Sequence, residues 1–245
     1  MYGTRARIGY TSPLLVSEIF PYEFYQLVPS GVTLALTTLD VWGRGTGTKL
    51  QDSYDRALRA GEAMAEAGVD LIILGGVPVL ASKGTENIDS VTAAMEEAGG
   101  VPVTTVSHAY RDAARQLGAK KIVIVEAPHT HGDDVLERAG LTVLGRKGYA
   151  GGRNVESTRQ SSDEIAQLGR ELVRAHPDAD TLWINWPHRA TVDQIEHLER
   201  ELGVSVLSAT QAIVWEALRL CGIDDSIPGF GRLMREPRKQ MPSGV

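Results

Sequence analysis

The stretch Val69–Gly76, which reads VDLIILGG, decides the fold because Ala179–Trp186, ADTLWINW, repeats its design. In each stretch an acidic residue precedes a short apolar run, and the run leads into Gly-Gly or Asn-Trp-Pro. Short apolar runs bounded in this way predict buried strands of a parallel sheet. Two copies of one strand-and-loop unit indicate that the chain contains two related α/β halves.

Two further pairs of segments repeat in the same order. Glu97–Thr105, EAGGVPVTT, matches Glu201–Leu207, ELGVSVL, and each leads into a helical segment. Ile8–Pro13, IGYTSP, resembles Val123–Pro128, VIVEAP. Because the order of the matches is kept, we expect an α/β fold made of two pseudo-symmetric parallel-sheet halves.

The boundary between the halves is expected near Gly118–Lys120, which gives an N-terminal half of residues 1–118 and a C-terminal half of residues 119–245. Part of the C-terminal segment could pack on the first half. Val- and Ile-rich runs predict strands over Arg7–Thr11, Thr33–Thr37, Leu71–Leu74, Val103–Thr105, Lys121–Val125, Thr142–Leu144, Thr181–Ile184 and Val204–Leu207. Amphipathic segments predict helices over Gln51–Glu66, Thr85–Ala98, Ala109–Leu117, Ser162–Ala175, Thr191–Leu202 and Gln211–Leu220.

The composition is that of a globular protein, since 42% of the 245 residues are hydrophobic and 23% are charged. A net charge of -6 without a Lys/Arg cluster argues against nucleic acid and favours a small-molecule carboxylate as partner. No apolar run is long enough to span a bilayer and no signal-like segment opens the chain, so we expect a soluble, cytoplasmic protein without membrane contact. Assembly into a homo-oligomer stays open. Cys221 is the only cysteine, which excludes an intrachain disulfide and a Cys-rich zinc site.

Ligands of open parallel sheets bind outside the carboxyl ends of the strands. We therefore expect the functional site between the halves, where the strand-end loops of both meet. Pro13 is the candidate substrate contact in the first of these loops. The four loops are Ser12–Leu15, Gly75–Val79, Pro128–Asp134 and Asn185–Arg189.

The second loop begins with paired glycines, which let a ligand approach the backbone closely. Gly75, Gly76 and Val77 are therefore candidate substrate-binding residues whose amides would hold an anion. The alternative is a tight turn after a buried strand, without any ligand.

The fourth loop gathers an amide, an indole, an imidazole and a guanidinium. Arg189 could bind a carboxylate, and His188 could move a proton because imidazole titrates near neutral pH. Asn185 and Trp186 are candidate substrate contacts in the same loop. The alternative is that Trp186 packs between layers while His188 and Arg189 are solvated.

The third loop brings His129, His131 and Asp133 close together in the sequence. A His-x-His pair followed by Asp can ligate a divalent metal, with His188 as a further ligand. His129 and His131 are also candidate catalytic residues. A simpler interpretation is an exposed loop in which Asp133 or Asp134 caps the next helix. The remaining histidines, expected to be structural or solvent-facing and without convergent partners, are His108, His176 and His197.

Several segments spread over nearly the whole chain carry a resemblance. They are Ile8–Pro13, Val101–Ser107, Leu198–Ala209 continuing into Trp215–Leu220, and Ile227–Leu233. These segments are similar to those of the aspartate/glutamate racemase superfamily and, within it, the arylmalonate decarboxylase and maleate cis-trans isomerase branch. The resemblance implies two pseudo-symmetric α/β halves and an enzyme that needs no cofactor.

The resemblance also implies cysteine chemistry that this chain lacks. The racemases and the isomerase use one cysteine from each half, and the decarboxylase keeps only the second, with glycine at the first position. These positions fall here on Gly76 and on Trp186, or on Asn185. Cys221 lies near the end of a helix and cannot replace either one. Asn154 matches an asparagine that contacts substrate in the isomerase branch.

Three functions follow from these observations and stay open. The first is a cofactor-independent lyase or isomerase of a small carboxylic acid, with His188 as proton donor in place of a thiol. The second is a metal-assisted hydrolase or lyase that uses His129, His131 and Asp133. The third is a non-catalytic, ligand-binding descendant in which Trp186 fills the space of the lost site.

Overall fold

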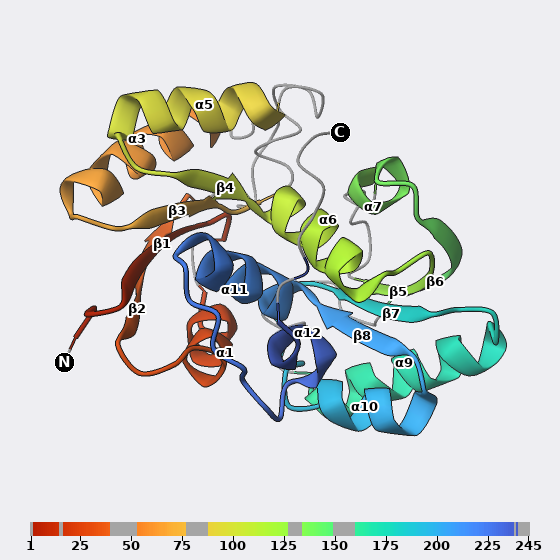
Figure 1. Ribbon diagram of the computed structural model, residues 1–245. Helices are drawn as coiled ribbons and strands as arrows, with labels where there is room; N and C mark the ends of the chain where they lie inside the picture. The colour runs from red at the N-terminus through yellow and green to blue at the C-terminus, as the bar shows by residue number, and fades with distance from the viewer. Residues whose placement is uncertain are drawn as a thin grey trace. The chain divides into compact units, whose positions relative to one another are not determined.

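The computed structural model describes residues 2–14, 17–39, 53–76, 88–126, 134–148, 160–237 and 239. The chain forms two compact units, Met1–Ala109 and Tyr110–Val245, each built around one sheet (Figure 1). Helix α6 (Val106–Leu117) begins in the first unit and continues into the second. The boundary predicted after residue 118 lies at the end of this same helix.

The first unit contains a four-stranded parallel sheet in the order β2-β1-β3-β4. Helices α3 and α5 lie together and contribute to one core with strand β3 (Figure 1). The strands are β1 (Ala6–Ser12), β2 (Val32–Thr38), β3 (Leu71–Leu74) and β4 (Val103–Thr105). Besides α6, the helices are α1 (Ile19–Leu27), α3 (Ser53–Glu66) and α5 (Ile88–Gly99).

The second unit contains a four-stranded parallel sheet in the order β6-β5-β7-β8. The strands are β5 (Lys121–Glu126), β6 (Thr142–Gly148), β7 (Thr181–Asn185) and β8 (Ser205–Ser208). The helices are α7 (Asp134–Arg138), α9 (Ser162–Ala175), α10 (Ile195–Leu202), α11 (Ala209–Leu220) and α12 (Gly231–Arg235).

The two sheets have the same strand order, so the predicted α/β fold with two parallel-sheet units is confirmed. Strand register makes the correspondence exact to the residue. Leu71 pairs with Ile8 in the first unit, and its counterpart Thr181 pairs with Ile122 in the second. Ile8 therefore corresponds to Ile122, one residue earlier than the sequence match with Val123 suggests.

The cores explain why the strands read as continuous apolar runs. All four residues of β3 are buried, because helices cover the sheet on both faces. On one side Ile72 and Leu74 pack with side chains of α3 and α5. On the other side of the sheet, Tyr10 of β1 stacks on Phe20 of α1 with ring centroids 4.0 Å apart. Within the described ranges, no helix is both long and apolar enough to cross a bilayer.

Candidate active site at the strand-end loops

The paired glycines at the carboxyl end of β3 are required by the backbone. A Cβ atom on Gly75 would lie 2.1 Å from the carbonyl oxygen of Thr11, and Gly76 has a φ of 92°. Side chains are excluded by contact at the first position and strained at the second. The backbone of this loop therefore favours glycine at both positions.

Hydroxyl groups hold the neighbouring end of β1 to this loop. The backbone N–H of Gly75 donates to Thr11 Oγ1 over 3.0 Å, and the N–H of Leu14 donates to Ser12 Oγ over 3.3 Å. Pro13 lies buried between these residues. The N–H of Gly75 is therefore already engaged by the protein, which leaves Gly76 as the described glycine whose amide is a candidate donor to an anion.

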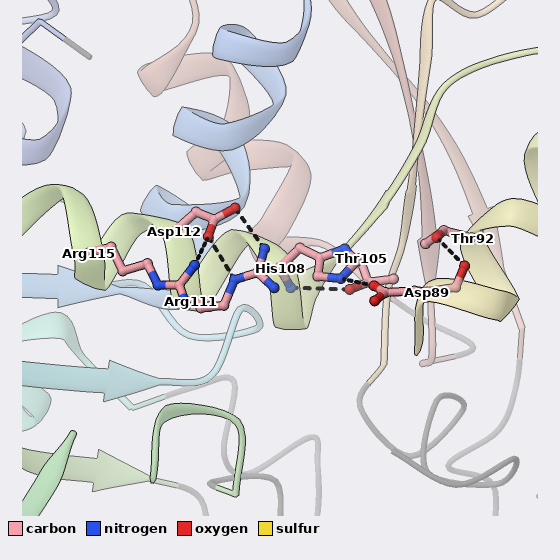
Figure 2. Close-up of polar contacts among 7 residues, drawn as sticks. All are labelled: Asp89, Thr92, Thr105, His108, Arg111, Asp112 and Arg115. Atoms are coloured by element: carbon pink, nitrogen blue, oxygen red, sulfur yellow. Dashed lines mark hydrogen bonds and ion pairs between the residues drawn. The ribbon is translucent and has the colours of Figure 1, made fainter. Parts of the chain in front are cut away.

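The start of α6 lies at the carboxyl end of β4, the next strand of this sheet. Thr105 Oγ1 accepts from the N–H of His108 over 3.2 Å and so caps the helix. Figure 2 shows His108 reaching toward α5, where its Nε2 lies 3.1 Å from Asp89 Oδ1. The expectation that His108 lacks a partner is wrong, because the helix packing brings Asp89 from an earlier part of the chain.

The loop after β7 is anchored in the second unit. Asn185, at the end of β7, pairs in register with Glu126 at the end of β5. Thr210, in the first turn of α11, donates from Oγ1 to the carbonyl of Pro187 over 3.4 Å. Arg189 donates from its guanidinium to the side-chain oxygen of Gln160. These contacts tie the loop to elements distant in sequence.

The polar side chains of this loop are largely inside the protein. His188 is 3% exposed and Arg189 is 1% exposed, whereas Trp186 is half-buried. The ring centroids of Trp186 and His188 lie 5.8 Å apart in an edge-to-face arrangement. The alternative in which His188 and Arg189 are solvated is therefore wrong. A buried imidazole and a buried guanidinium therefore occupy consecutive positions in the loop after β7.

Burial controls the protonation of His188. Removal from water disfavours the imidazolium form, which lowers the pKa of His188 to about 4. The imidazole is therefore neutral at pH 7 in the free protein. A neutral ring can donate one N–H and accept a proton at its other nitrogen, so its chemistry depends on what charge enters the site.

Several predicted site residues lie outside the described residues. They are Val77, His129, His131, Asp133 and Asn154. Their proposed roles, including the metal-ligating set in the third loop, stay predictions. Within the ranges that the structure describes, no group of three or more His, Cys, Asp or Glu side chains is arranged to hold a metal ion.

The single cysteine lies away from the carboxyl edge of the second sheet. Cys221 follows the last residue of α11, whereas the first residue of that helix directly follows β8. A helix of this length places its ends about 18 Å apart at 1.5 Å per residue. The thiol of Cys221 therefore does not belong to the loop that holds His188.

The duplicated parallel sheets define the protein as a two-unit α/β protein with candidate site residues in the strand-end loops. A family model described as arylmalonate decarboxylase matches residues 32–234, and the chain belongs to that family. This finding confirms the resemblance in the sequence and the assignment to an enzyme family of decarboxylases and isomerases.

Individual relatives agree with the family assignment. The arylmalonate decarboxylase of Bordetella bronchiseptica is 29% identical over 79% of this chain and 85% of its own. The maleate isomerase of Geobacillus stearothermophilus is 27% identical over 62% of this chain and 61% of its own. A structure of unliganded arylmalonate decarboxylase superposes with a TM-score of 0.80 at 25% identity, covering 94% of this chain and 98% of the other.

The structure adds residues that the sequence pattern did not single out. Gln160 reaches Arg189 across 29 positions, a separation at which no local pattern signals a contact. Thr210 and Ser107 occupy equivalent places at the starts of α11 and α6, and both are buried. The aligned repeats VTTVSH and VLSATQ contain this signal, but only the strand register shows which residues correspond.

Proposed function

We propose that the protein is a cofactor-independent lyase or isomerase that acts on a small dicarboxylic acid and uses acid/base chemistry without a thiol. The names of its relatives support the substrate class, since an arylmalonate and maleate each carry two carboxylates. The main support for thiol-free chemistry is the buried pair of His188 and Arg189 in a chain whose only cysteine is Cys221.

Electrostatics suggest how such a substrate would change His188. A bound carboxylate near the ring favours the imidazolium form and opposes the effect of burial, so its arrival would raise the pKa of His188. The site would then take up one proton together with the substrate. Arg189 supplies a permanent positive charge in the same loop, which favours binding of the dianion.

In a decarboxylation, the bond between the α-carbon and one carboxylate breaks. Carbon dioxide leaves, and the electron pair remains on the α-carbon, delocalised into the second carboxylate as an enediolate. The imidazolium of His188 gives its proton to that carbon and returns to the neutral form that burial favours. Backbone amides at Gly76 and Val77 are the candidate donors to the enediolate oxygens. In an isomerisation, the neutral imidazole of His188 would add to one alkene carbon, and the electron pair of the double bond would move into the far carboxylate as an enediolate. The central C–C bond, now single, would rotate before the double bond re-forms and expels the imidazole.

The test is turnover of phenylmalonate and of maleate, followed by nuclear magnetic resonance, with wild type, His188→Gln and His197→Gln. His197 is an exposed histidine of α10 and serves as the matched control. We expect His188→Gln to lose at least about 100-fold in kcat, the usual scale of general acid catalysis, and His197→Gln to stay near wild type.

The same assay separates the other two functions. A chelator that abolishes turnover would favour the metal-assisted reaction of the third loop over the proposed one. Binding of both acids without any turnover would favour a ligand-binding descendant. Full activity in a folded His188→Gln variant would remove His188 from the mechanism.

A further inference from the structure

The internal duplication allows each residue of the first unit to be compared with its counterpart in the second. Leu74 pairs with Thr105 where β3 meets β4, and Ile184 pairs with Ser208 where β7 meets β8. Thr105 therefore corresponds to Ser208. Both cap a helix in the same way, because each accepts from the N–H three residues ahead over 3.2 Å.

Two residues beyond each cap lies a second buried hydroxyl, and here the units differ. Thr210 is fully buried and donates to the carbonyl of Pro187 in the loop after β7. Ser107 is 2% exposed, and its Oγ has no hydrogen-bond partner in the described part of the chain. One hydroxyl holds a loop, and its counterpart makes no hydrogen bond with the residues that the structure describes.

The correspondence also indicates which loop Ser107 faces. Because Leu71 corresponds to Thr181, Gly75 corresponds to Asn185 and Gly76 to Trp186. The loop that Thr210 contacts at Pro187 therefore corresponds to the glycine loop. Ser107 thus lies in the first turn of α6 on the side of Gly75–Gly76. A buried hydroxyl without a partner is costly, so a donor to which no described residue offers an acceptor favours an acceptor from outside the chain.

We propose that Ser107 is a substrate-binding residue whose hydroxyl donates a hydrogen bond to a carboxylate oxygen of the dicarboxylic acid. This assignment rests on the proposed function and adds a specific donor to it. The helix strengthens the site, because the positive end of the α6 dipole lies at its first turn and favours a negative ligand group. The twelve residues of α6 are enough for this effect.

The experiment measures malonate binding by isothermal titration calorimetry and thermal unfolding of the full-length chain. The variants are Ser107→Ala, Ser107→Thr and Thr210→Val. Malonate serves as the probe because it carries two carboxylates and no aryl group. We expect Ser107→Ala to raise the Kd for malonate roughly 10- to 100-fold, the scale of one hydrogen bond to a charged group, and Ser107→Thr to restore binding.

Thermal unfolding separates binding from a structural role. Ser107→Ala should leave Tm unchanged or slightly raised, because it removes a donor that makes no hydrogen bond among the described ranges of the chain. Thr210→Val should lower Tm, because it breaks the bond to Pro187. The contrast between the two equivalent positions is the expected signature.

Three results would overturn the assignment: an unchanged malonate Kd in Ser107→Ala, a Tm lowered in that variant as much as in Thr210→Val, or no malonate binding by wild type. The lowered Tm would be expected if the hydroxyl of Ser107 donates to a buried water, because Ser107→Ala would then remove a hydrogen bond of the free protein. If wild type and Ser107→Thr bind malonate but turn over neither phenylmalonate nor maleate, the proposed reaction fails while the role of Ser107 in binding stands.

Discussion

Replacing His188 by Gln should remove a specific part of the pH dependence of stability. The ring titrates near 6.5 in the unfolded chain and near 4 in the folded protein, where it is 3% exposed. Between these values the unfolded chain binds the proton and the folded protein does not. The stabilisation is therefore fully present above pH 6.5 and is lost as the pH falls toward 4.

The size of the effect follows from the difference between 6.5 and about 4, which is 2.5 units. At 1.36 kcal/mol per unit, the difference corresponds to about 3 kcal/mol of folding free energy. Between pH 7 and pH 4, the free energy of unfolding should therefore fall by about 3 kcal/mol more in wild type than in His188→Gln. The other ionisable groups are the same in both proteins and cancel in the comparison.

Urea unfolding followed by circular dichroism at half-unit steps of pH measures the two curves. His197→Gln is again the control, because it makes the same substitution at an exposed position of the same unit. Parallel curves for wild type and His188→Gln would refute the reasoning, since they would mean that the ring titrates alike in the folded and unfolded states.

Two further substitutions test the local geometry of the strand-end loops. Gly75→Ala should destabilise the protein by about 1–3 kcal/mol or more in urea unfolding, because its Cβ would meet the Thr11 carbonyl oxygen at 2.1 Å. Gly148→Ala should cost little, because the nearest described atom to its Cβ is the carbonyl oxygen of Glu126 at 4.0 Å. An equal cost for both variants would contradict this account. Ser208→Ala should cost about 0.5–2 kcal/mol, because it removes the capping box formed with Gln211, and an unchanged stability would show that the cap contributes nothing.

The strand pattern was predictable because burial on both faces of a parallel sheet leaves a clear apolar signal. Leu71–Leu74 and Val103–Thr105 match the predicted strands residue for residue. Helix α1 was not foreseen, since Pro21 and a run of aromatic residues weaken its helical signal. Packing of Phe20 and Phe24, both fully buried, decides its conformation instead.

The start of α6 shows a different limit of the sequence pattern. The predicted helix begins at Ala109, three residues after the observed start at Val106. Thr105 and Val106 are β-branched and favour a strand. The hydroxyl of Thr105 nevertheless caps the helix, so that the helix starts directly after it at Val106.

The location of the site at the strand-end loops stays a prediction, and the structure changes what the sequence suggests about the chemistry of its residues. Residue type suggests that His188 titrates near neutral pH, but its burial decides otherwise. The contact of Arg189 with Gln160 depends on how β7 lies beside the segment before α9, which no local pattern encodes. The roles of His129, His131, Asp133, Val77 and Asn154 lie outside the described residues and stay predictions.

Turnover by a Cys221→Ser variant tests the central claim most directly. The assay follows release of carbon dioxide from phenylmalonate and conversion of maleate to fumarate, with wild type measured beside the variant. The account predicts that wild type turns over one of the two acids and that Cys221→Ser does so at the same rate. A folded Cys221→Ser protein that loses at least about 100-fold in kcat, the scale of a lost acid/base group, would contradict thiol-free chemistry.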